Sequence, residues 1–162
     1  MFTTQQDTTI KDYILADPVL SVLEPSTDNV NLILAALNAN KSPAFYVWRD
    51  KVTQDEIMQN GFDWTQVDNL TVGKARIWQW MFDNASKSIN PTKANIRAGV
   101  DAAWVGTAAM LAVRAVIYTH LYRPATVLEA LFATGTGTTV SPGDIATHGA
   151  IHFTDVTRIL QW

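Results

Sequence analysis

The feature that most constrains this sequence is the apolar stretch at residues 107–132. Between its first residue and Tyr122, the polar exceptions are Arg114, Thr119 and His120. A helix on the surface of a domain keeps one polar face, whereas a helix that is apolar nearly all round is normally enclosed by its neighbours. The stretch therefore predicts a central helix, continued by a second one, around which the rest of the chain packs.

The composition points to a chain with more apolar surface than a small monomer easily hides. Of the 162 residues, 48% are hydrophobic and 17% are charged, below the usual quarter, and six are tryptophan. One domain with a substantial core fits this length. We expect other subunits to cover part of its surface, the alternative being a well-packed monomer.

Several classes of protein are excluded or disfavoured at once. The chain has no cysteine, which excludes disulfides, thiolate nucleophiles and cysteine metal sites. Its first 13 residues lack the basic and apolar regions of a signal peptide. The longest apolar stretch is interrupted by Arg114 and is shorter than the about 20 residues that a bilayer span needs. We therefore expect a soluble, intracellular protein without a membrane partner.

The net charge of −3 is divided unevenly along the chain. Residues 1–70 hold four basic and ten acidic side chains, a net −6, whereas residues 71–162 hold eight basic and five acidic ones, a net +3. Complementary potentials fix the register of associating proteins, so head-to-tail contact between copies is one interpretation. An accident of surface composition is the other. No basic cluster suggests nucleic acid as a partner.

Capping residues and apolar stripes predict an all-α fold, a bundle of five or six helices with an irregular, extended C-terminal arm. In residues 72–86, Val72, Ile77, Trp80 and Met81 approximate one inward face, and Trp78 and Phe82 widen it. Residues 44–52 have β propensity and are read either as a short strand or as the approach to a helix. The first helix is expected to start at Thr3 or Thr4, and the second at Ser26, Thr27 or Asp28. The later helices are expected to start at the Thr53–Glu56 capping box, Thr71, Asn90-Pro91, Thr107 and Pro124.

The C-terminal residues 134–162 differ in composition from the helical residues 1–133. They begin with a Gly/Thr/Ser-rich segment without periodicity, which predicts a flexible hinge, and end in an apolar tail. The tail either folds back on the core or docks on a partner protein, and we regard the two parts as one domain. The side chains assigned to partner docking are Ile151, Phe153, Val156, Ile159, Leu160 and Trp162.

No catalytic, cofactor or metal site is predicted. The GTGT run at residues 135–138 lacks both the Gly-Lys-Ser/Thr of a P-loop and the third glycine of a dinucleotide turn. His148 and His152 have helical spacing, but Gly149 between them disfavours a helix. The adjacent Asp55 and Glu56 are read as partners of a helix dipole rather than as an acid–base pair.

Three further residues are candidates for contacts between subunits. Arg114 is the lone charge of the central helix and needs a partner, either Asp101 or Glu129 in the same chain or a group on another subunit. Trp48 and Trp64 fall in irregular segments, where aromatic anchors of interfaces are common. Trp78, Trp80 and Trp104 are expected in the core.

Several strings of residues resemble a small protein encoded among the virion-assembly genes of tailed bacteriophages and prophages. The resemblance spans most of residues 43–156, while residues 1–42 match only in style, through an N-terminal TTQQ and a helix. The strings are SPAFYVWRDKV at 42–52, NGFDWTQVDNLTVGKARIWQWM at 60–81, INPTKANIRAGVDAAWV at 89–105, EALFATGTGT at 129–138 and FTDV at 153–156.

The resemblance implies a structural role in the virion. Among virion proteins, a helical chain of this size with a C-terminal arm is similar to a head–tail connector, or adaptor, which forms a ring of about a dozen copies beneath the portal. Its partners would be the portal protein and a tail-proximal connector or tail protein, with DNA present only as the contents of the channel. The location would be the head–tail interface, preceded by the host cytoplasm during assembly.

Other functions remain open at this point. A tail terminator, head stopper or minor capsid component belongs to the same structural class. A helical DNA-binding regulator would need a basic recognition helix, and the cationic residues here are scattered. An enzyme is the least favoured interpretation.

Overall fold

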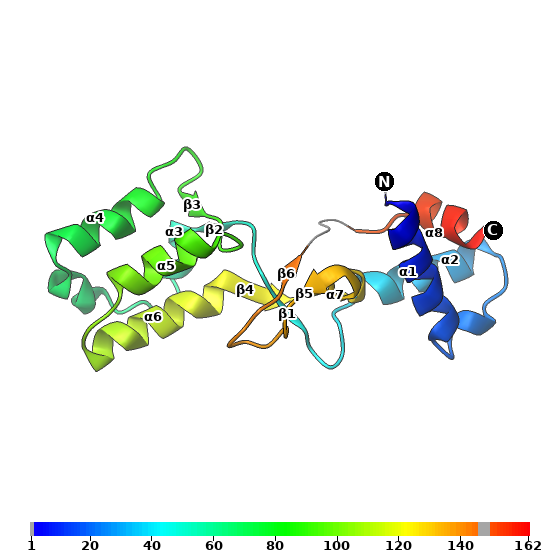
Figure 1. Cartoon of the computed structure of the whole chain (residues 1–162), viewed down its shortest axis with the longest axis horizontal. Helices are drawn as coiled ribbons and strands as arrows, with labels where there is room; N and C mark the ends of the chain where they lie inside the picture. The colour runs from blue at the N-terminus through cyan, green and yellow to red at the C-terminus, as the bar shows by residue number, and fades with distance from the viewer. Residues whose placement is uncertain (1, 146–149) are drawn as a thin grey trace. The chain divides into compact units, whose positions relative to one another are not determined.

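The computed structural model describes residues 2–145 and 150–162, and more than half of them lie in helices (Figure 1). They form two compact units. Unit 1 contains Met1–Val47 and Pro124–Trp162, and unit 2 contains Trp48–Arg123. This division replaces the predicted one at residues 133 and 134, because the C-terminal segment belongs to the same unit as the N-terminal helices.

Unit 1 is built from both ends of the chain, and both termini lie in it (Figure 1). Its helices are α1 (Thr4–Ala16), η1 (Leu20–Val22, a 3₁₀ turn), α2 (Thr27–Asn38), α7 (Val127–Phe132) and α8 (Phe153–Leu160).

Side-chain caps fix where the first helices of unit 1 begin. Thr3 accepts from the backbone N–H of Gln6, whose side chain in turn accepts from the backbone N–H of Thr3, which confirms the predicted start of α1. Ser26 caps α2, as predicted, by accepting from the backbone N–H of Asn29. The start at Pro124 was predicted wrongly, because that residue lies in a strand and α7 begins after the capping box of Thr126 and Glu129.

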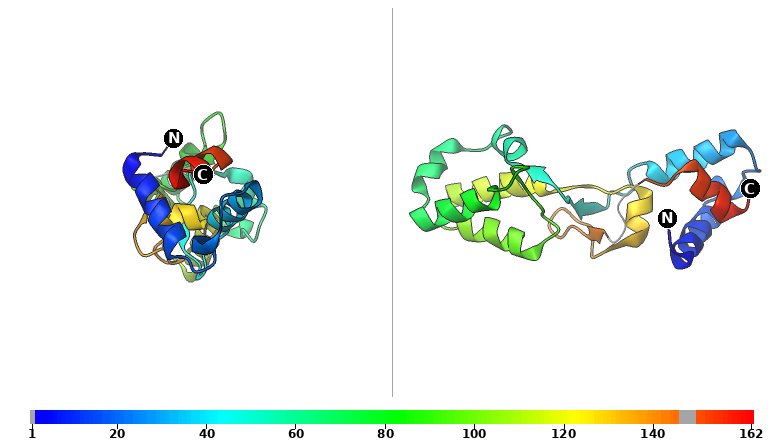
Figure 2. Two further views of the ribbon diagram at one scale, coloured as in Figure 1. Left: turned by 90° about the vertical axis from the view of Figure 1, so that its right-hand side faces the viewer. Right: turned by 90° about the horizontal axis from the view of Figure 1, so that it is seen from above.

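The core of unit 1 includes the C-terminal segment. In Figures 1 and 2, α8 lies beside α1 and α2. Ile151, Val156 and Ile159 are at most 6% exposed and pack with apolar residues from α1, α2 and α7. A free, extended arm is therefore wrong for residues 150–162. The segment folds back because its apolar face completes a core that the other helices leave open.

Unit 2 contains the middle of the chain. Its elements are α3 (Gln54–Met58), η2 (Trp64–Asn69), α4 (Val72–Met81), α5 (Ala94–Ala103) and α6 (Ala108–Leu121), with the short strands β2 (Val52–Thr53) and β3 (Ser88–Ile89). Caps at Thr53, Thr71 and Thr107 start α3, α4 and α6 as predicted. Asn90 does not start a helix, since its side chain closes a turn onto Thr92 and α5 begins at Ala94.

Aromatic rings form the centre of unit 2 and determine which face of α4 is buried. Trp78 packs against Phe62, Phe82 and Trp104, with ring centroids 4.9–6.4 Å apart. Trp80 lies two residues further along the helix, about 200° round its axis, and is 67% exposed. The predicted inward positions of Val72 and Trp80 are therefore wrong.

The predicted central helix α6 is buried on one side only. Met110, Val113, Ile117 and Leu121 face the core, whereas Leu111 and the alanines at 108, 112 and 115 are exposed. Its outer face is apolar but consists mostly of small side chains, so it presents little apolar area to water. This is why a helix with a nearly continuous apolar sequence is not enclosed.

Short strands join segments that are distant in the sequence. Within the described residues they form three two-stranded sheets, which an all-α fold does not contain. β1 (Tyr46–Trp48) pairs with β4 (Tyr122–Pro124), and β2 pairs antiparallel with β3, Val52 opposite Ile89. The chain crosses between the units within β1 and again after Arg123 in β4. Residues 44–52 thus contain a strand, one of the two alternatives that the sequence left open.

The Gly/Thr-rich segment forms a hairpin. β5 (Ala133–Thr134) pairs antiparallel with β6 (Asp144–Ile145), and the backbone of Tyr46 exchanges hydrogen bonds of 2.7 and 2.8 Å with Gly137 and Gly143. The ring of Phe45 lies directly against both glycines. The expected structureless hinge is therefore incorrect for residues 133–145, while residues 146–149, including His148, lie outside the described residues.

Replacing Gly137 should destabilise this hairpin. Its φ of +66° disfavours any side chain, and a Cβ would overlap the ring of Phe45. We expect Gly137→Ala to lower the free energy of unfolding by about 1–3 kcal/mol, measured by chemical denaturation. Gly73→Ala is the matched control, because Gly73 lies in α4 with open space around it and should be neutral or stabilising by up to about 1 kcal/mol. Equal effects of the two changes would contradict the packing described for Phe45.

Shortening Ile159 should show that α8 is part of the core. Ile159→Ala leaves a cavity among α1, α2 and α8, and we expect a loss of about 2–5 kcal/mol in thermal or chemical unfolding. Val140→Ala, at a position 93% exposed in the same unit, should change stability by less than about 0.5 kcal/mol. An Ile159→Ala protein as stable as the control would mean that α8 is not packed in solution.

Candidate functional site

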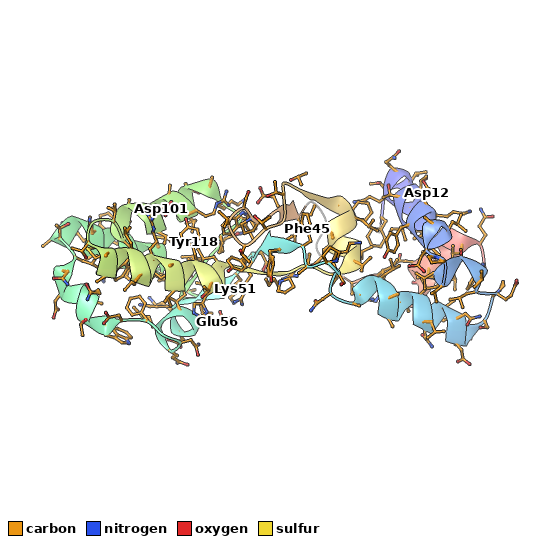
Figure 3. The ribbon with its side chains drawn as sticks, turned by 90° about the horizontal axis from the view of Figure 1, so that it is seen from below. Asp12, Phe45, Lys51, Glu56, Asp101 and Tyr118 are labelled. Carbon is orange, nitrogen blue, oxygen red and sulfur yellow. The ribbon has the colours of Figure 1, made fainter. Side chains whose placement is uncertain are left out.

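A clamp of polar side chains stabilises the start of α3. The Oε1 of Glu56 lies 2.7 Å from Nη2 of Arg49, and its Oε2 accepts from the backbone N–H of Thr53 at 2.8 Å. Arg49 also donates to the carbonyl of His120 at the end of α6, 3.3 Å away. The backbone bond from Thr53, followed by the Arg49 guanidinium, lowers the pKa of Glu56 from 4.5 to about 2. Glu56, labelled in Figure 3, is thus held as a helix cap.

The lone charge of α6 is paired within its own chain. Nη1 of Arg114 lies 3.5 Å from Oδ1 of Asp101 on α5, which is one of the two partners predicted for it. Tyr118 donates to the same oxygen at 3.1 Å (Figure 3). Burial, reinforced by the charge of Asp101, raises the pKa of Tyr118 to about 12. Because Asp101 already compensates Arg114, the predicted subunit contact of Arg114 is not required.

The two tryptophans assigned to subunit contacts have different environments. Trp48 is only 8% exposed and lies between the guanidinium of Arg97, 4.6 Å from its ring, and Tyr118, 6.1 Å between ring centroids. It is a core residue, and its assignment to an interface is wrong for this structure. Trp64 is 57% exposed and touches only the edge of the core through Phe62, so it is available for contact with another molecule.

One face of α4 carries large side chains that no other element of the described chain covers. Val72, Arg76 and Trp80 follow one another at a spacing of four residues, so they lie on the same side of the helix. Val72 is 69% and Trp80 67% exposed, and Arg76 is exposed between them. We call these three residues the α4 ridge. Tryptophan and arginine are the side chains most enriched at the energetic centres of protein interfaces.

Unit 1 has a groove between the start of α2 and α8. Its volume is about 340 Å³. The α2–α8 groove is lined by Pro25, Ser26, Thr27, Val30, Phe153, Thr157 and Trp162. Two carboxylates, Glu24 and Asp28, adjoin the lining residues in the sequence and are exposed. The groove therefore has a mainly apolar lining, and the residues on either side of Pro25–Thr27 in the sequence are acidic.

A second, smaller pocket of about 240 Å³ lies between α1 and α8. Arg158 of α8 occupies its wall, where it pairs with both oxygens of Asp7 on α1 and lies 3.7 Å from Asp155. These carboxylates raise the pKa of Arg158, with the hydrogen bond to Asp7 as the main cause. The pair links α8 to α1.

Unit 1 also exposes an aliphatic patch where α1 meets η1. Leu15, Val19 and Val22 are 54%, 68% and 73% exposed. Together with the α4 ridge, the α2–α8 groove and Trp64, this patch gives the chain several surfaces that suit contact with other proteins. Within residues 2–145 and 150–162, no three side chains are grouped as metal ligands, and no helix has the length and apolarity to cross a membrane.

The ridge and the groove are not recoverable from the sequence. The apolar pattern of α4 predicted that Val72 and Trp80 face inward together with Trp78, and only the contacts of Trp78 with Phe62 and Trp104 show which side is buried. The groove joins residues 25–30 to residues 153–162, which are brought together by the fold alone.

Comparison with known proteins adds no assignment: no family model, curated protein or solved structure matches this chain.

The clamp at Glu56 should make stability depend on pH. A carboxyl whose pKa is lowered by folding stabilises the protein above its ordinary pKa of 4.5, and this contribution is lost as the pH falls toward 2. Its side chain is 41% exposed, so solvent screening limits the contribution to about 1 kcal/mol. Glu56→Gln should therefore lower the melting temperature at neutral pH and converge with the parent protein in acid. A difference that stays constant over this range would exclude the ionised clamp.

Proposed function

We propose that this chain is a structural assembly protein of a tailed bacteriophage, acting as a head–tail connector between the portal and the tail. The resemblance of residues 43–156 to a virion-assembly protein supports the class. Its mostly helical fold is compatible with the helical domain expected of such a connector. No catalytic role and no cofactor form part of the proposal.

The observation that carries the proposal is the exposure of large apolar side chains on both units. Trp64 and Trp80 in unit 2, and Val19 and Val22 in unit 1, are all more than half exposed. At about 25 cal/mol per Å², covering the exposed part of one such tryptophan, roughly 90–170 Å², is worth about 2–4 kcal/mol before the costs of association. Such side chains suit a protein that works in contact with other proteins.

In this role, about a dozen copies form a ring beneath the portal, and the helical units build its wall around the DNA channel. The copies assemble in the host cytoplasm and remain at the head–tail interface of the virion. A tail-proximal connector or tail protein occupies the opposite side of the ring.

The contact with the portal needs a different assignment from the one made on sequence. Ile151, Val156 and Ile159 are buried in unit 1, so docking through them would require α8 to leave its core. We assign the contact instead to the aliphatic patch of Leu15, Val19 and Val22, which belongs to the same unit and is already exposed.

Co-purification with the portal protein of the same phage genome tests the proposal. The expected complex shows extra density at one end of the portal ring in negative-stain images. Val19→Asp combined with Val22→Asp should abolish binding, because a charge at each position would be desolvated by the contact. Val140→Asp, exposed elsewhere in unit 1, is the matched control and should bind normally.

Two results would contradict the proposal. A folded protein that leaves the portal bare excludes the connector role, and binding to a tail protein alone would assign the chain to another part of the virion. Portal binding that survives the double aspartate variant would show that the aliphatic patch is not the contact.

A further inference from the structure

We infer that the α4 ridge of one copy seats in the α2–α8 groove of a second copy. The inference deepens the proposed assembly role, since it names the surfaces through which copies join. It rests on the shape and the charge of the two surfaces.

The ridge has the form of an anchor. Trp80 projects from a helix whose opposite side is held in the aromatic core by Trp78 and Phe82, so the backbone that carries it is fixed. Arg76 lies one turn before it and makes no ion pair within the described chain. A rigid aromatic side chain loses little conformational entropy on binding, and a neighbouring arginine selects an acidic partner.

The groove has the matching properties. Val30, Phe153 and Trp162 give it apolar walls, and its volume of about 340 Å³ lies within the range of cavities that enclose ring-sized groups. Glu24 and Asp28, which flank the lining residues Pro25–Thr27 in the sequence, make no ion pair within the part of the chain that the structure describes. Both carboxylates are therefore free to form a charge-assisted hydrogen bond with an arginine that accompanies an indole into the groove.

The charges of the units identify the occupant as a second copy joined head to tail. Unit 1 holds three basic and eight acidic side chains, a net −5, and unit 2 holds nine basic and seven acidic ones, a net +2. Two copies of unit 1 repel each other, whereas unit 1 of one copy and unit 2 of another attract. The groove belongs to the acidic unit and the ridge to the basic one.

Such a contact is heterologous, because it joins two different surfaces. An open chain of copies keeps a free ridge at one end and a free groove at the other until it closes, so the contact generates either a ring or a filament. A copy with a defective ridge can still offer its groove, and it therefore ends a growing assembly.

Sedimentation velocity of the purified chain, over a series of concentrations and without portal, measures the contact directly. The parent protein should form species larger than a monomer as its concentration rises. Trp80→Ala and Arg76→Glu should each weaken this association at least about tenfold, the effect expected at the centre of an interface. Val105→Ala, at an exposed apolar position of unit 2 outside the ridge, is the control and should associate like the parent protein.

Charge reversal tests which surfaces meet. Glu24→Arg should weaken association although it lies far from the ridge in the sequence, and the chain that carries both Arg76→Glu and Glu24→Arg should recover it. A ridge-to-ridge dimer would instead leave Glu24→Arg without effect and keep the double variant weak. Circular dichroism of all variants should match the parent protein, because each replaced side chain is exposed.

The inference is overturned if the parent protein stays monomeric at its highest soluble concentration, or if Val105→Ala weakens association and Trp80→Ala does not. Neither result bears on the binding of the portal, which is measured separately. Conversely, self-association through ridge and groove in a protein that does not bind portal would retain the contact and refute the connector role.

Discussion

The structure depends first on the burial of the apolar face of α8 against α1 and α2. Ile151, Val156 and Ile159 join a core whose other members come from the first 40 residues and from α7. Unit 1 is therefore closed only when the two ends of the chain meet, and residues 48–123 are inserted into it as a second unit. Removing the last helix would expose the apolar sides of α1 and α2 together, which is why a segment that looks like a free arm in the sequence is structural.

A second constraint is the aromatic cluster of unit 2. The indole N–H groups of Trp78 and Trp104 are buried without a conventional hydrogen-bond partner among the described residues, at a cost of about 1–3 kcal/mol each. The two rings are perpendicular to within a few degrees, an arrangement in which ring edges meet ring faces. Burying each ring contributes roughly 4–6 kcal/mol at about 25 cal/mol per Å², so packing outweighs the lost hydrogen bonds. By fixing the inner face of α4, the cluster also leaves Trp80 and Arg76 outside.

The surfaces proposed for assembly are thus by-products of the two cores. Closing unit 1 brings the start of α2 beside α8 and makes the groove, while packing unit 2 turns the ridge outward. Each unit carries a charge opposite to that of the other, which favours unlike surfaces meeting over like ones. A protein built in this way needs no mobile arm to join its neighbours, since both surfaces are held on rigid helices. The aliphatic patch at the end of α1 remains for a different partner.

The sequence by itself determined the local structure. Thr3, Ser26, Thr53, Thr71 and Thr107 each cap a helix where they were expected to, because a cap is an interaction between residues three apart. Asp101 was likewise foreseen as a partner of Arg114, since an unpaired charge in an apolar helix demands one. Predictions from local signals were wrong at other positions. Asn90 and Pro124 do not start helices. Gly137 and Gly143 do not form a hinge, because the ring of Phe45 packs directly against them. Which face of α4 is buried, where α8 packs and how the groove forms were decided by the tertiary structure alone, because each depends on contacts between residues far apart in the chain.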